Sequence, residues 1–398
     1  MAHQEKCTSV LLRSIQDTFT KYETARSVRF HSPVVALCNR LIQGTVIAYI
    51  IIVVFLFDKG YQLQEQGESS VVAKVVGLQR NLKKDFHDNT STFEALALTW
   101  DSSDTVVPPL ENDAVFITTK LTATPKQVQT VCPEDKDVGA NCQTNADCRI
   151  GRSIHLGHGH LAGTCNGSTG TCDVHAWCPL ENENRRSVEL TGGRDLVVLV
   201  KNYILFPKYR IRRRNIGELD DDYVKSCAFN VKTDPYCPAF NLGYIIEQAG
   251  EDYNEMADIG AVLSFAIRWD CNLDYHIRHC VPKYSFRRLD EKKGGSFPGW
   301  NYRRTGYWEE NGRQIRYLLK HTGIRIVFNV YAVAGKFSFV RFTMNLGSGL
   351  GLLGTATILC DFLIYQCARR NTKDFRTQAA TLIAENELRD AKLNGEVY

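Results

Sequence analysis

The sequence predicts a membrane protein with two transmembrane helices joined by a large, disulfide-rich, mainly antiparallel β ectodomain. Three observations lead to this class. Two long apolar runs lie near the ends of the 398-residue chain. Ten of the 14 cysteines lie between these runs, from Cys132 to Cys280. The same middle part holds several stretches of β-branched and aromatic residues separated by turn residues.

The first apolar run, residues 41–57, contains no charged residue. Extended back through residues 34–38 it approaches the roughly 20 residues that cross a bilayer. It starts too late for a signal peptide, and no small-residue cleavage site follows it. The second run, residues 342–366, has Asp361 as its single charge. We therefore expect transmembrane helices at 34–57 and 341–366. A buried core helix of a soluble protein remains the alternative for each run. This alternative has more weight for the second run, which is more polar.

Basic residues precede the first apolar run and follow the second. Positively charged segments next to membrane spans stay in the cytoplasm. They place residues 1–33 and 367–398 inside the cell and residues 58–340 outside. These flanks are Lys6, Arg13, Lys21, Arg26, Arg29 and Arg40 before the first run, and Arg369, Arg370, Lys373 and Arg376 after the second.

Two features of residues 58–340 agree with an outside location. The even number of cysteines suits an oxidising compartment. Two sequons predict glycosylation at Asn89 and Asn166. Six of the cysteines lie in residues 132–178, a head segment with too little apolar content to fold without disulfides. Six cysteines can form three disulfides in 15 ways, and the sequence of this segment does not choose among them.

Zinc is the rival interpretation of the cysteine-rich head, because four histidines lie near its cysteines. No metal site is assigned, and a weak modulatory metal site on residues 155–160 is kept as an alternative to a solvated loop. The four histidines are His155, His158, His160 and His175.

The segment between the two apolar runs should consist mainly of strands, because Val, Ile, Phe and Tyr are frequent there. One helix is expected, at residues 245–261. The strands are expected at residues 69–78, 114–123, 196–206, 261–269 and 323–334.

The second apolar run is suited to line a pore. It carries polar residues that are costly against lipid but not against water or a neighbouring helix. Four glycines permit close helix approach, and the first and third of them form a G-x-x-x-G pattern: Gly347, Gly349, Gly351 and Gly354. The alternative is that these residues only pack two helices together. The predicted pore and gate residues are Asn345, Ser348, Gly351, Thr355 and Asp361.

Composition and motifs exclude several function classes. A net charge of +4, from 48 basic and 44 acidic residues, is too balanced for a dedicated nucleic-acid binder. The sequence has no P-loop, no H-E-x-x-H and no G-x-S-x-G motif. We therefore expect no enzyme and no cofactor.

The chain resembles the ionotropic purinergic receptors, which are trimeric ATP-gated cation channels, from about Tyr22 to Cys367. The resemblance rests on long motifs throughout the chain. They are YETAR (22–26), KGYQ (59–62), AWCP (176–179), KTDPYCP (232–238), WDCNLD (269–274), YSFRRLD (284–290), AGKF (334–337) and LCD (359–361).

The resemblance implies a homotrimer, or a heterotrimer with related subunits, in the plasma membrane; an organelle membrane fits the same topology. It implies a non-selective pore for Na⁺, K⁺ and Ca²⁺, lined by the second span, and ATP bound between subunits. It also implies a phosphorylation site at Thr24. The implied disulfides are Cys132–Cys178, Cys142–Cys165, Cys148–Cys172, Cys227–Cys237 and Cys271–Cys280.

The family holds ATP with two groups of residues from neighbouring subunits. Asn301, Arg303 and Lys320 match the second group, with Tyr302 in place of the family's Phe. Lys74 matches the first lysine of the family's K-x-K pair. Two family positions have changed: Val76 replaces the second lysine, and Val197 replaces a threonine that contacts adenine.

These losses predict weakened ATP sensitivity, because a charge-assisted hydrogen bond contributes about 1.5–3 kcal/mol. Lys201 and Arg194 are nearby candidates to compensate. The main alternative is an accessory subunit that conducts poorly alone. A proton- or peptide-gated trimer and a nucleotide-hydrolysing ectoenzyme are weaker alternatives.

Overall fold

The computed structural model describes residues 33–80, 99–109, 111–181, 187–216, 220–291 and 299–370. The chain divides into two units. A helical unit comprises Met1–Leu63 and Phe337–Tyr398, and a β-rich unit comprises Gln64–Lys336.

The helical unit contains two helices long and apolar enough to cross a membrane. The first combines α2 (Pro33–Tyr49) with the π-helical turns η1 (Ile50–Phe57), and the second is α7 (Phe339–Arg370). The apolar segments Ala36–Phe57 and Phe339–Cys360 have mean hydropathies of 2.2 and 1.2, and only 6% and 11% of an 18-residue apolar stretch within each is buried. Since a soluble core helix would be mostly buried, this exposure favours the membrane interpretation over the core-helix alternative.

The α2–η1 helix and α7 pack along one face of each. The rings of Phe55 and Phe342 have centroids 5.7 Å apart. Gly349 lies against Ile50, where an added Cβ would be 2.8 Å from the Ile50 Cδ1 atom. Gly347 and Gly351 have no neighbour within 4 Å of such a Cβ. Within this helix pair, Gly349 is the member of the expected glycine set that makes the close approach, and the G-x-x-x-G pair is not.

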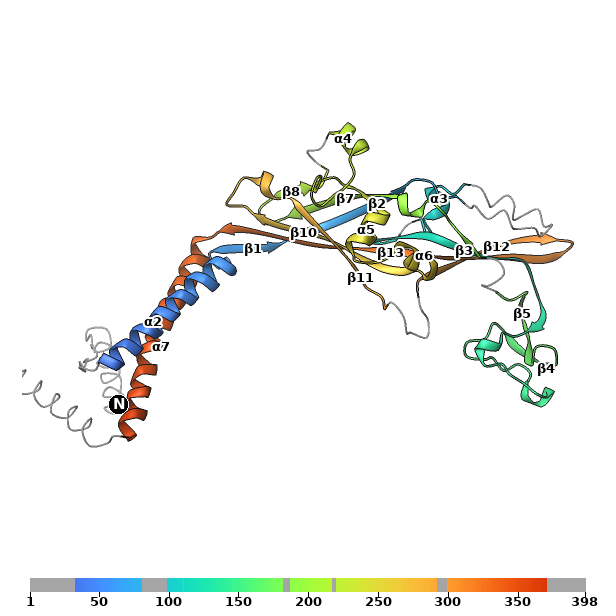
Figure 1. Cartoon of the computed structure of the whole chain (residues 1–398), viewed down its shortest axis with the longest axis horizontal. Helices are drawn as coiled ribbons and strands as arrows, with labels where there is room; N and C mark the ends of the chain where they lie inside the picture. The colour runs from blue at the N-terminus through green and yellow to red at the C-terminus, as the bar shows by residue number, and fades with distance from the viewer. Residues whose placement is uncertain are drawn as a thin grey trace, which may run out of the picture. The chain divides into compact units, whose positions relative to one another are not determined.

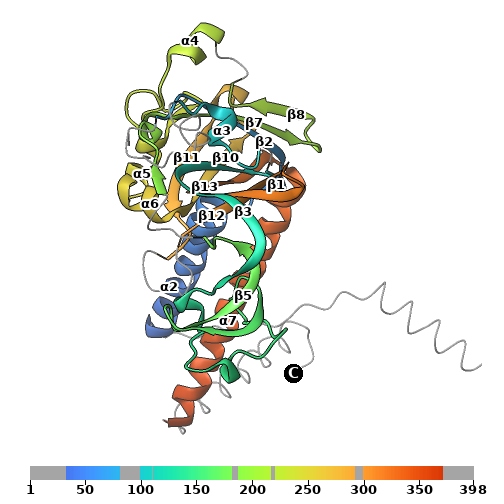
Figure 2. The same cartoon turned by 90° about the vertical axis from the view of Figure 1, so that its right-hand side faces the viewer.

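Two sheets form the β-rich unit, as Figure 1 and Figure 2 show. The larger has nine strands in the main order β11-β10-β13-β3-β5-β4, with β1 and β12 paired to β13 and β6 paired to β3. Its strands are β1 (Gln62–Gln66), β3 (Ala114–Pro133), β4 (His160–Asn166), β5 (Thr171–Cys178), β6 (Ser187–Glu189), β10 (Ala261–Asn272), β11 (Pro282–Arg288), β12 (Asn301–Glu310) and β13 (Arg313–Phe337).

The smaller sheet has the order β2-β7-β8, with β9 paired to β7. Its strands are β2 (Glu68–Val76), β7 (Val197–Phe206), β8 (Ile211–Arg214) and β9 (Ala239–Asn241). Short helices connect the strands: α3 (Ser102–Thr105), α4 (Asp221–Ser226), α5 (Leu242–Gln248) and α6 (Tyr253–Ile259), with the 3₁₀ turns η2 (Lys136–Val138), η3 (Asn145–Asp147), η4 (Gly193–Asp195) and η5 (Ile277–His279).

The core of the β-rich unit lies between the two sheets. Along β7 every second residue is buried, so one face of this strand packs inward. The Trp269 indole of β10 donates a 2.7 Å hydrogen bond to the Asn202 Oδ1 atom of β7, which joins the sheets. Phe240, Phe265 and Tyr284 pack edge to face around this contact, at centroid distances of 4.8 to 5.7 Å.

The five expected strands are all present, and most pairs are antiparallel. One pair differs: β10 runs parallel to β13 from Ala261↔Ile324 to Asn272↔Gly335. The single helix expected at 245–261 was wrong. Gly250, at a φ of 76°, ends α5 and separates it from α6, and β10 already begins at Ala261.

Candidate functional site

The β12–β13 hairpin brings together the three residues that match the family's second group. Arg303 lies directly opposite Lys320, and Asn301 is two residues before Arg303 on the same strand. Directly opposed residues of antiparallel strands point to the same face with their Cβ atoms about 4.5–5.5 Å apart. The register alone therefore places two cationic side chains and one amide side by side.

A carboxylate lies between these cations. The Arg303 Nε atom donates to Glu181 Oε2 at 2.9 Å, and the Lys320 Nζ atom lies 3.6 Å from Glu181 Oε1. Arg303 Nη1 also donates to Asn301 Oδ1 at 3.1 Å. Because the Lys320 and Glu181 side chains are only 11% exposed, this is a partly desolvated pair, and water screens it weakly. The group is therefore already arranged around an anion.

Sequence reasoning missed Glu181. The residue lies three positions after Cys178 and two after the end of the AWCP motif, but nothing in the local pattern distinguishes it from an ordinary surface acid. Only the pairing of β3 with β5, which ends at Cys178, brings this segment to the β12–β13 hairpin.

Tyr302 and His321, which pair with each other beside Arg303 and Lys320, carry no charge at the site. Tyr302 packs against Phe116 with ring centroids 6.3 Å apart. His321, which follows Lys320, is buried, and its Nδ1 atom lies 3.2 Å from the Thr118 hydroxyl. Burial, and then the charge of Arg304, lower the pKa of His321 to about 4. The imidazole is therefore neutral at physiological pH and adds no charge to the site.

The first group lies on the outer face of β2, which belongs to the smaller sheet. Lys74 is exposed and lies opposite Leu199 of β7. Val76 is 58% exposed and lies directly opposite Val197. The two departures from the family pattern therefore face each other and form one apolar patch where the family has a lysine and a threonine.

Lys201 and Arg194 are the two residues that could replace the charge missing at Val76. Lys201 lies on the same outer face of the smaller sheet as Lys74, whereas Arg194 packs elsewhere. Lys201 is exposed and opposite Val72, one same-face step along β7 from Leu199. Diagonal neighbours of this kind lie about 7–8 Å apart, so Lys201 is near Lys74 but on the side away from Val76. The Arg194 stem lies against Gly243.

The two groups lie on different sheets of one chain. Lys74, Val76 and Val197 belong to the smaller sheet, whereas Asn301, Arg303 and Lys320 belong to the larger. Within the described residues no hydrogen bond or ion pair joins them.

The predicted pore residues do not share one environment. Asn345 is partly buried and donates from Nδ2 to the Gly60 carbonyl oxygen at 2.5 Å, so it faces the end of the first span. Ser348, Gly351 and Thr355 are exposed and repeat at three- and four-residue steps, which places them on one face of α7. The side chain of Asp361 lies outside the described residues.

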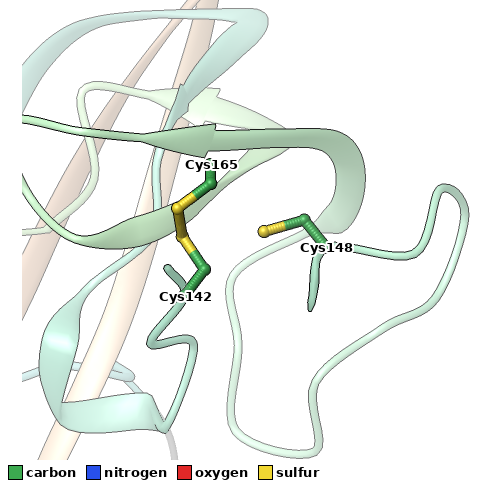
Figure 3. A group of neighbouring side chains, drawn as sticks. All are labelled: Cys142, Cys148 and Cys165. Atoms are coloured by element: carbon green, nitrogen blue, oxygen red, sulfur yellow. A yellow bond between two sulfur atoms is a disulfide. The ribbon is translucent and has the colours of Figure 1, made fainter. Parts of the chain in front are cut away.

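Five disulfides stabilise the β-rich unit, and three of them lie within the head. The five bonds are the pairs that the resemblance implies: Cys132–Cys178, Cys142–Cys165, Cys148–Cys172, Cys227–Cys237 and Cys271–Cys280. Figure 3 shows that Cys148 lies beside the Cys142–Cys165 bond. In the described part of the chain, each group of three close metal-ligating atoms contains cysteines that are already bonded in disulfides. This finding argues against a structural zinc site there.

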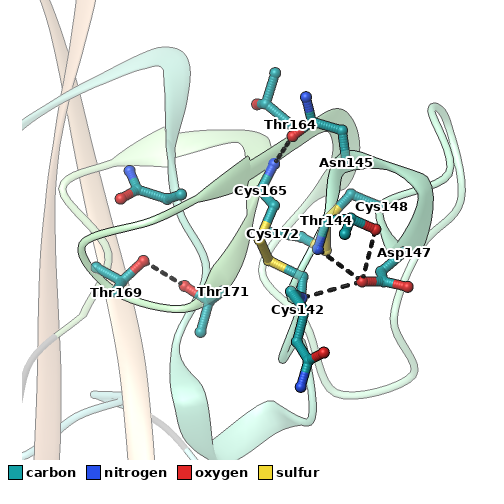
Figure 4. Close-up of a disulfide and its surroundings, with 12 residues drawn as sticks. Cys142, Thr144, Asn145, Asp147, Cys148, Thr164, Cys165, Thr169, Thr171 and Cys172 are labelled. Atoms are coloured by element: carbon teal, nitrogen blue, oxygen red, sulfur yellow. Dashed lines mark hydrogen bonds between the residues drawn. A yellow bond between two sulfur atoms is a disulfide. The ribbon is translucent and has the colours of Figure 1, made fainter.

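Hydrogen bonds support the same segment, as Figure 4 shows. Asn145 Oδ1 accepts from the Cys165 amide at 2.8 Å. Asp147 accepts from the amides of Thr144 and Gln143, which lower the pKa of its carboxyl. Asn166, a predicted glycan acceptor, lies at the end of β4 and accepts from Ser168 of its own sequon. Asn89 and Thr24 lie outside the described residues.

Comparisons with known proteins point to one family. A family model described as ATP P2X receptor matches residues 20–380. P2X purinoceptor 4 of Mus musculus is 39% identical over 359 residues, which cover 88% of this chain and 90% of that protein. P2X purinoceptor 2 of Cavia porcellus is 35% identical over 376 residues, which cover 93% of this chain and 76% of that protein.

Two solved structures are similar along most of the chain. One is a P2X receptor from the Gulf Coast tick in the presence of ATP and Zn²⁺, with a TM-score of 0.73 and 36% identity, covering 82% of this chain and 99% of that one. The other is the chicken P2X7 receptor with the competitive antagonist TNP-ATP, with a TM-score of 0.67 and 29% identity. The match covers 83% of this chain and 99% of that one.

Proposed function

This chain belongs to the P2X receptor family, whose members are ligand-gated ion channels and not enzymes, and from that premise we propose that it is an extracellular ATP-gated, non-selective cation channel. Na⁺ and Ca²⁺ enter and K⁺ leaves when it opens. One observation carries the proposal: Arg303 and Lys320 converge on the Glu181 carboxylate, and Asn301 accepts a hydrogen bond from Arg303, so the hairpin presents an anion site.

The triphosphate of ATP takes the place of the Glu181 carboxylate. A phosphate group offers several acceptor oxygens, and the planar guanidinium of Arg303 can donate two parallel hydrogen bonds to it. Lys320 adds a point charge. In the unliganded chain Glu181 compensates both cations, and ATP must displace it.

The remaining charge comes from Lys74 of a neighbouring subunit in a trimer. Both groups of cations are needed to hold the roughly four negative charges of ATP, and they lie on separate sheets of one chain. An interface between two copies can bring the outer face of β2 opposite the hairpin of the next copy.

ATP sensitivity is weak in a homotrimer. Val76 offers no donor to the phosphates, and Val197 offers none to the base. The loss of one charge-assisted hydrogen bond corresponds to about 1.5–3 kcal/mol, or roughly 10- to more than 100-fold in affinity.

The channel resides in the plasma membrane with both termini in the cytoplasm. The basic flanks of both spans support this orientation. Ser348, Gly351 and Thr355 line the pore, because they form an exposed and partly polar face of α7. Glycans at Asn89 and Asn166 and phosphate at Thr24 fit this orientation.

Whole-cell recording under fast ATP application, from 1 μM to 10 mM, tests the proposal on cells that express this chain alone. Surface labelling runs in parallel. The expected result is a cation current that needs near-millimolar ATP. Surface trimers without current, even after the double change Val76→Lys and Val197→Thr, would contradict an autonomous channel.

A second candidate function is that of an accessory subunit in a heterotrimer. The apolar Val76–Val197 pair favours it. A chain whose β2 face binds ATP poorly can still use its β12–β13 hairpin to complete the site of a related neighbouring subunit. Co-expression with a related subunit would then change the ATP sensitivity of that subunit's current.

A further inference from the structure

The β7–β8 hairpin concentrates positive charge that the proposed ATP site does not use. Five of the seven residues from Lys208 to Arg214 are cationic, and four of these five are arginines. The side chains of Lys208, Arg210, Arg212 and Arg214 are exposed, and none of them forms an ion pair with another described residue. A basic run of this length is typical of a surface that binds a polyanion.

Two of these arginines lie side by side on the outer face of the smaller sheet. β8 is an edge strand of this sheet, and its Arg214 and Arg212 lie opposite Tyr203 and Leu205 of β7. Tyr203 and Leu205 belong to the face of β7 that points away from the core. Alternate residues of a strand are about 7 Å apart, so the two arginines start from regularly spaced positions.

Two contacts hold the backbone of the hairpin in place. The Arg213 Nε atom donates to the Cys280 carbonyl oxygen at 3.3 Å, and Cys280 forms a disulfide with Cys271. In the turn, the Lys208 amide donates to Glu65 Oε1 at 2.7 Å. The exposed cations therefore extend from a fixed backbone, which lowers the cost of ordering them on a ligand.

Three carboxylates lie near the hairpin and reduce its charge only in part. Burial, and then the charges of Glu65 and Asp274, raise the pKa of Tyr209 in the turn. Glu68 of β2 lies on the same outer face as Arg212, on the other side of β7. The five cations outnumber these three carboxylates, so the hairpin keeps a net positive charge.

An acidic run, Asp220–Asp222, follows the hairpin in sequence but does not cover it. Figure 2 shows that α4, which begins at Asp221, lies well apart from β8. Charges on an edge strand can also serve to prevent pairing between two sheets. That role accounts for Arg212 and Arg214 but not for Lys208 and Arg210, which precede the strand.

We propose that the β7–β8 hairpin binds a sulfated polysaccharide of the cell surface, of the heparin-like glycosaminoglycan class. Arginine suits sulfate as it suits phosphate, because its planar guanidinium can donate two parallel hydrogen bonds to neighbouring oxygens. An extended chain with repeating sulfates matches the regular spacing of Arg212 and Arg214. The inference rests on the extracellular position that the proposed function gives the β-rich unit, and the five disulfides of this unit suit that compartment.

Binding of labelled heparin to the purified full-length protein, measured at several salt concentrations, tests this surface. The double change Arg212→Gln and Arg214→Gln should weaken binding roughly tenfold or more at physiological salt. It should also reduce the slope of log affinity against log salt by about 2, because each lost contact releases about one counterion fewer. The double change to Lys should keep most of the slope, since it keeps both charges.

Two further variants make the test specific. The double change Arg149→Gln and Arg152→Gln is the matched control, because both arginines are exposed but lie in the head. It should leave heparin binding unchanged. Glu68→Gln removes an acid from the face that carries Arg212, and should tighten binding about two- to fivefold.

Four results would overturn the proposal. Unchanged binding by the Arg212 and Arg214 double Gln variant would place heparin on another cationic surface, such as Arg303 and Lys320. An equal loss in the head control, or equal binding of unsulfated hyaluronan, would indicate unspecific attraction. Equal or tighter binding of single-stranded RNA or of phosphatidylserine vesicles would indicate a different partner. None of these measurements uses ATP or a current, so a chain that binds heparin but does not open with ATP would contradict only the proposed function.

Discussion

At the scale of single residues, position 76 decides how much positive charge the outer face of β2 presents to a ligand. Val76→Lys should lower the ATP concentration for half-maximal current about tenfold or more, because it adds one charge-assisted donor on the face that already carries Lys74. Dose–response currents measure this shift.

Val72→Lys is the matched control for that substitution. Val72 is 53% exposed, lies on the same face of β2 and is also two residues from Lys74, but in the other direction. An equal gain from both variants would show that general attraction of ATP, and not a defined phosphate contact at position 76, sets the sensitivity.

We expect Glu181 to compete with ATP for Arg303 and Lys320, the two cations that it contacts. Glu181→Gln should raise the affinity for ATP about three- to tenfold, because Lys320 and Arg303 would no longer lose a carboxylate when ATP binds. The gain is small because Arg303 is 52% exposed, so water screens its ion pair with Glu181. Direct binding of labelled ATP to purified protein measures this without gating. Unchanged or weaker binding would mean that Glu181 orients the cations and does not compete.

His321 makes the stability of the protein depend on pH. Its pKa of about 4 in the folded state lies below the ordinary 6.5, so the unfolded state binds more protons between these values. Its contribution is complete above pH 6.5 and is lost progressively as the pH falls from 6.5 to 4. The melting temperature of His321→Gln should therefore change less with pH than that of the wild type. Parallel pH curves for both proteins would contradict this assignment.

At the scale of elements, the contact between the α2–η1 helix and α7 depends on one glycine. Gly349→Ala should lower the thermal stability of the purified protein, because the new methyl group meets Ile50 at 2.8 Å. Gly347→Ala is the control, since no atom lies within 4 Å of its Cβ and alanine favours a helix by about 1 kcal/mol over glycine. The two variants should shift the melting temperature in opposite directions. A loss in both would place Gly347 in a contact as well.

The sequence predicted the element types better than their limits and neighbours. The five strands could be predicted because β-branched and aromatic residues dominate them. The single helix at 245–261 could not be corrected from its pattern, since its apolar spacing continues across Gly250, and only the positive φ there ends α5. The parallel pairing of β10 with β13 connects segments that no local pattern relates.

The candidate site was predictable only where a motif marked it. Asn301, Arg303 and Lys320 were found by resemblance, and the strand register places them together. Glu181 was missed because its role arises from a contact 122 residues away in sequence from Arg303. Asn345 was predicted with the other pore residues by polarity, but its amide bonds to Gly60 instead of sharing their exposed face.

At the scale of the whole molecule, the two halves of the site should act in trans. In a Val76→Lys background, Lys74→Ala removes a cation from one half of every site, and Lys320→Ala removes one from the other half. Each variant alone should bind labelled ATP weakly, because all three interfaces of its homotrimer are damaged.

Co-expression should restore binding if the halves come from neighbouring subunits. A trimer that contains both variants has one interface where an intact Lys74 meets an intact Lys320, so about one tight site per mixed trimer is expected. Labelled ATP bound by purified mixed trimers, selected through two different affinity tags, measures this number. A site completed within one chain predicts the opposite, because neither variant then contains both lysines and mixing cannot restore any tight binding.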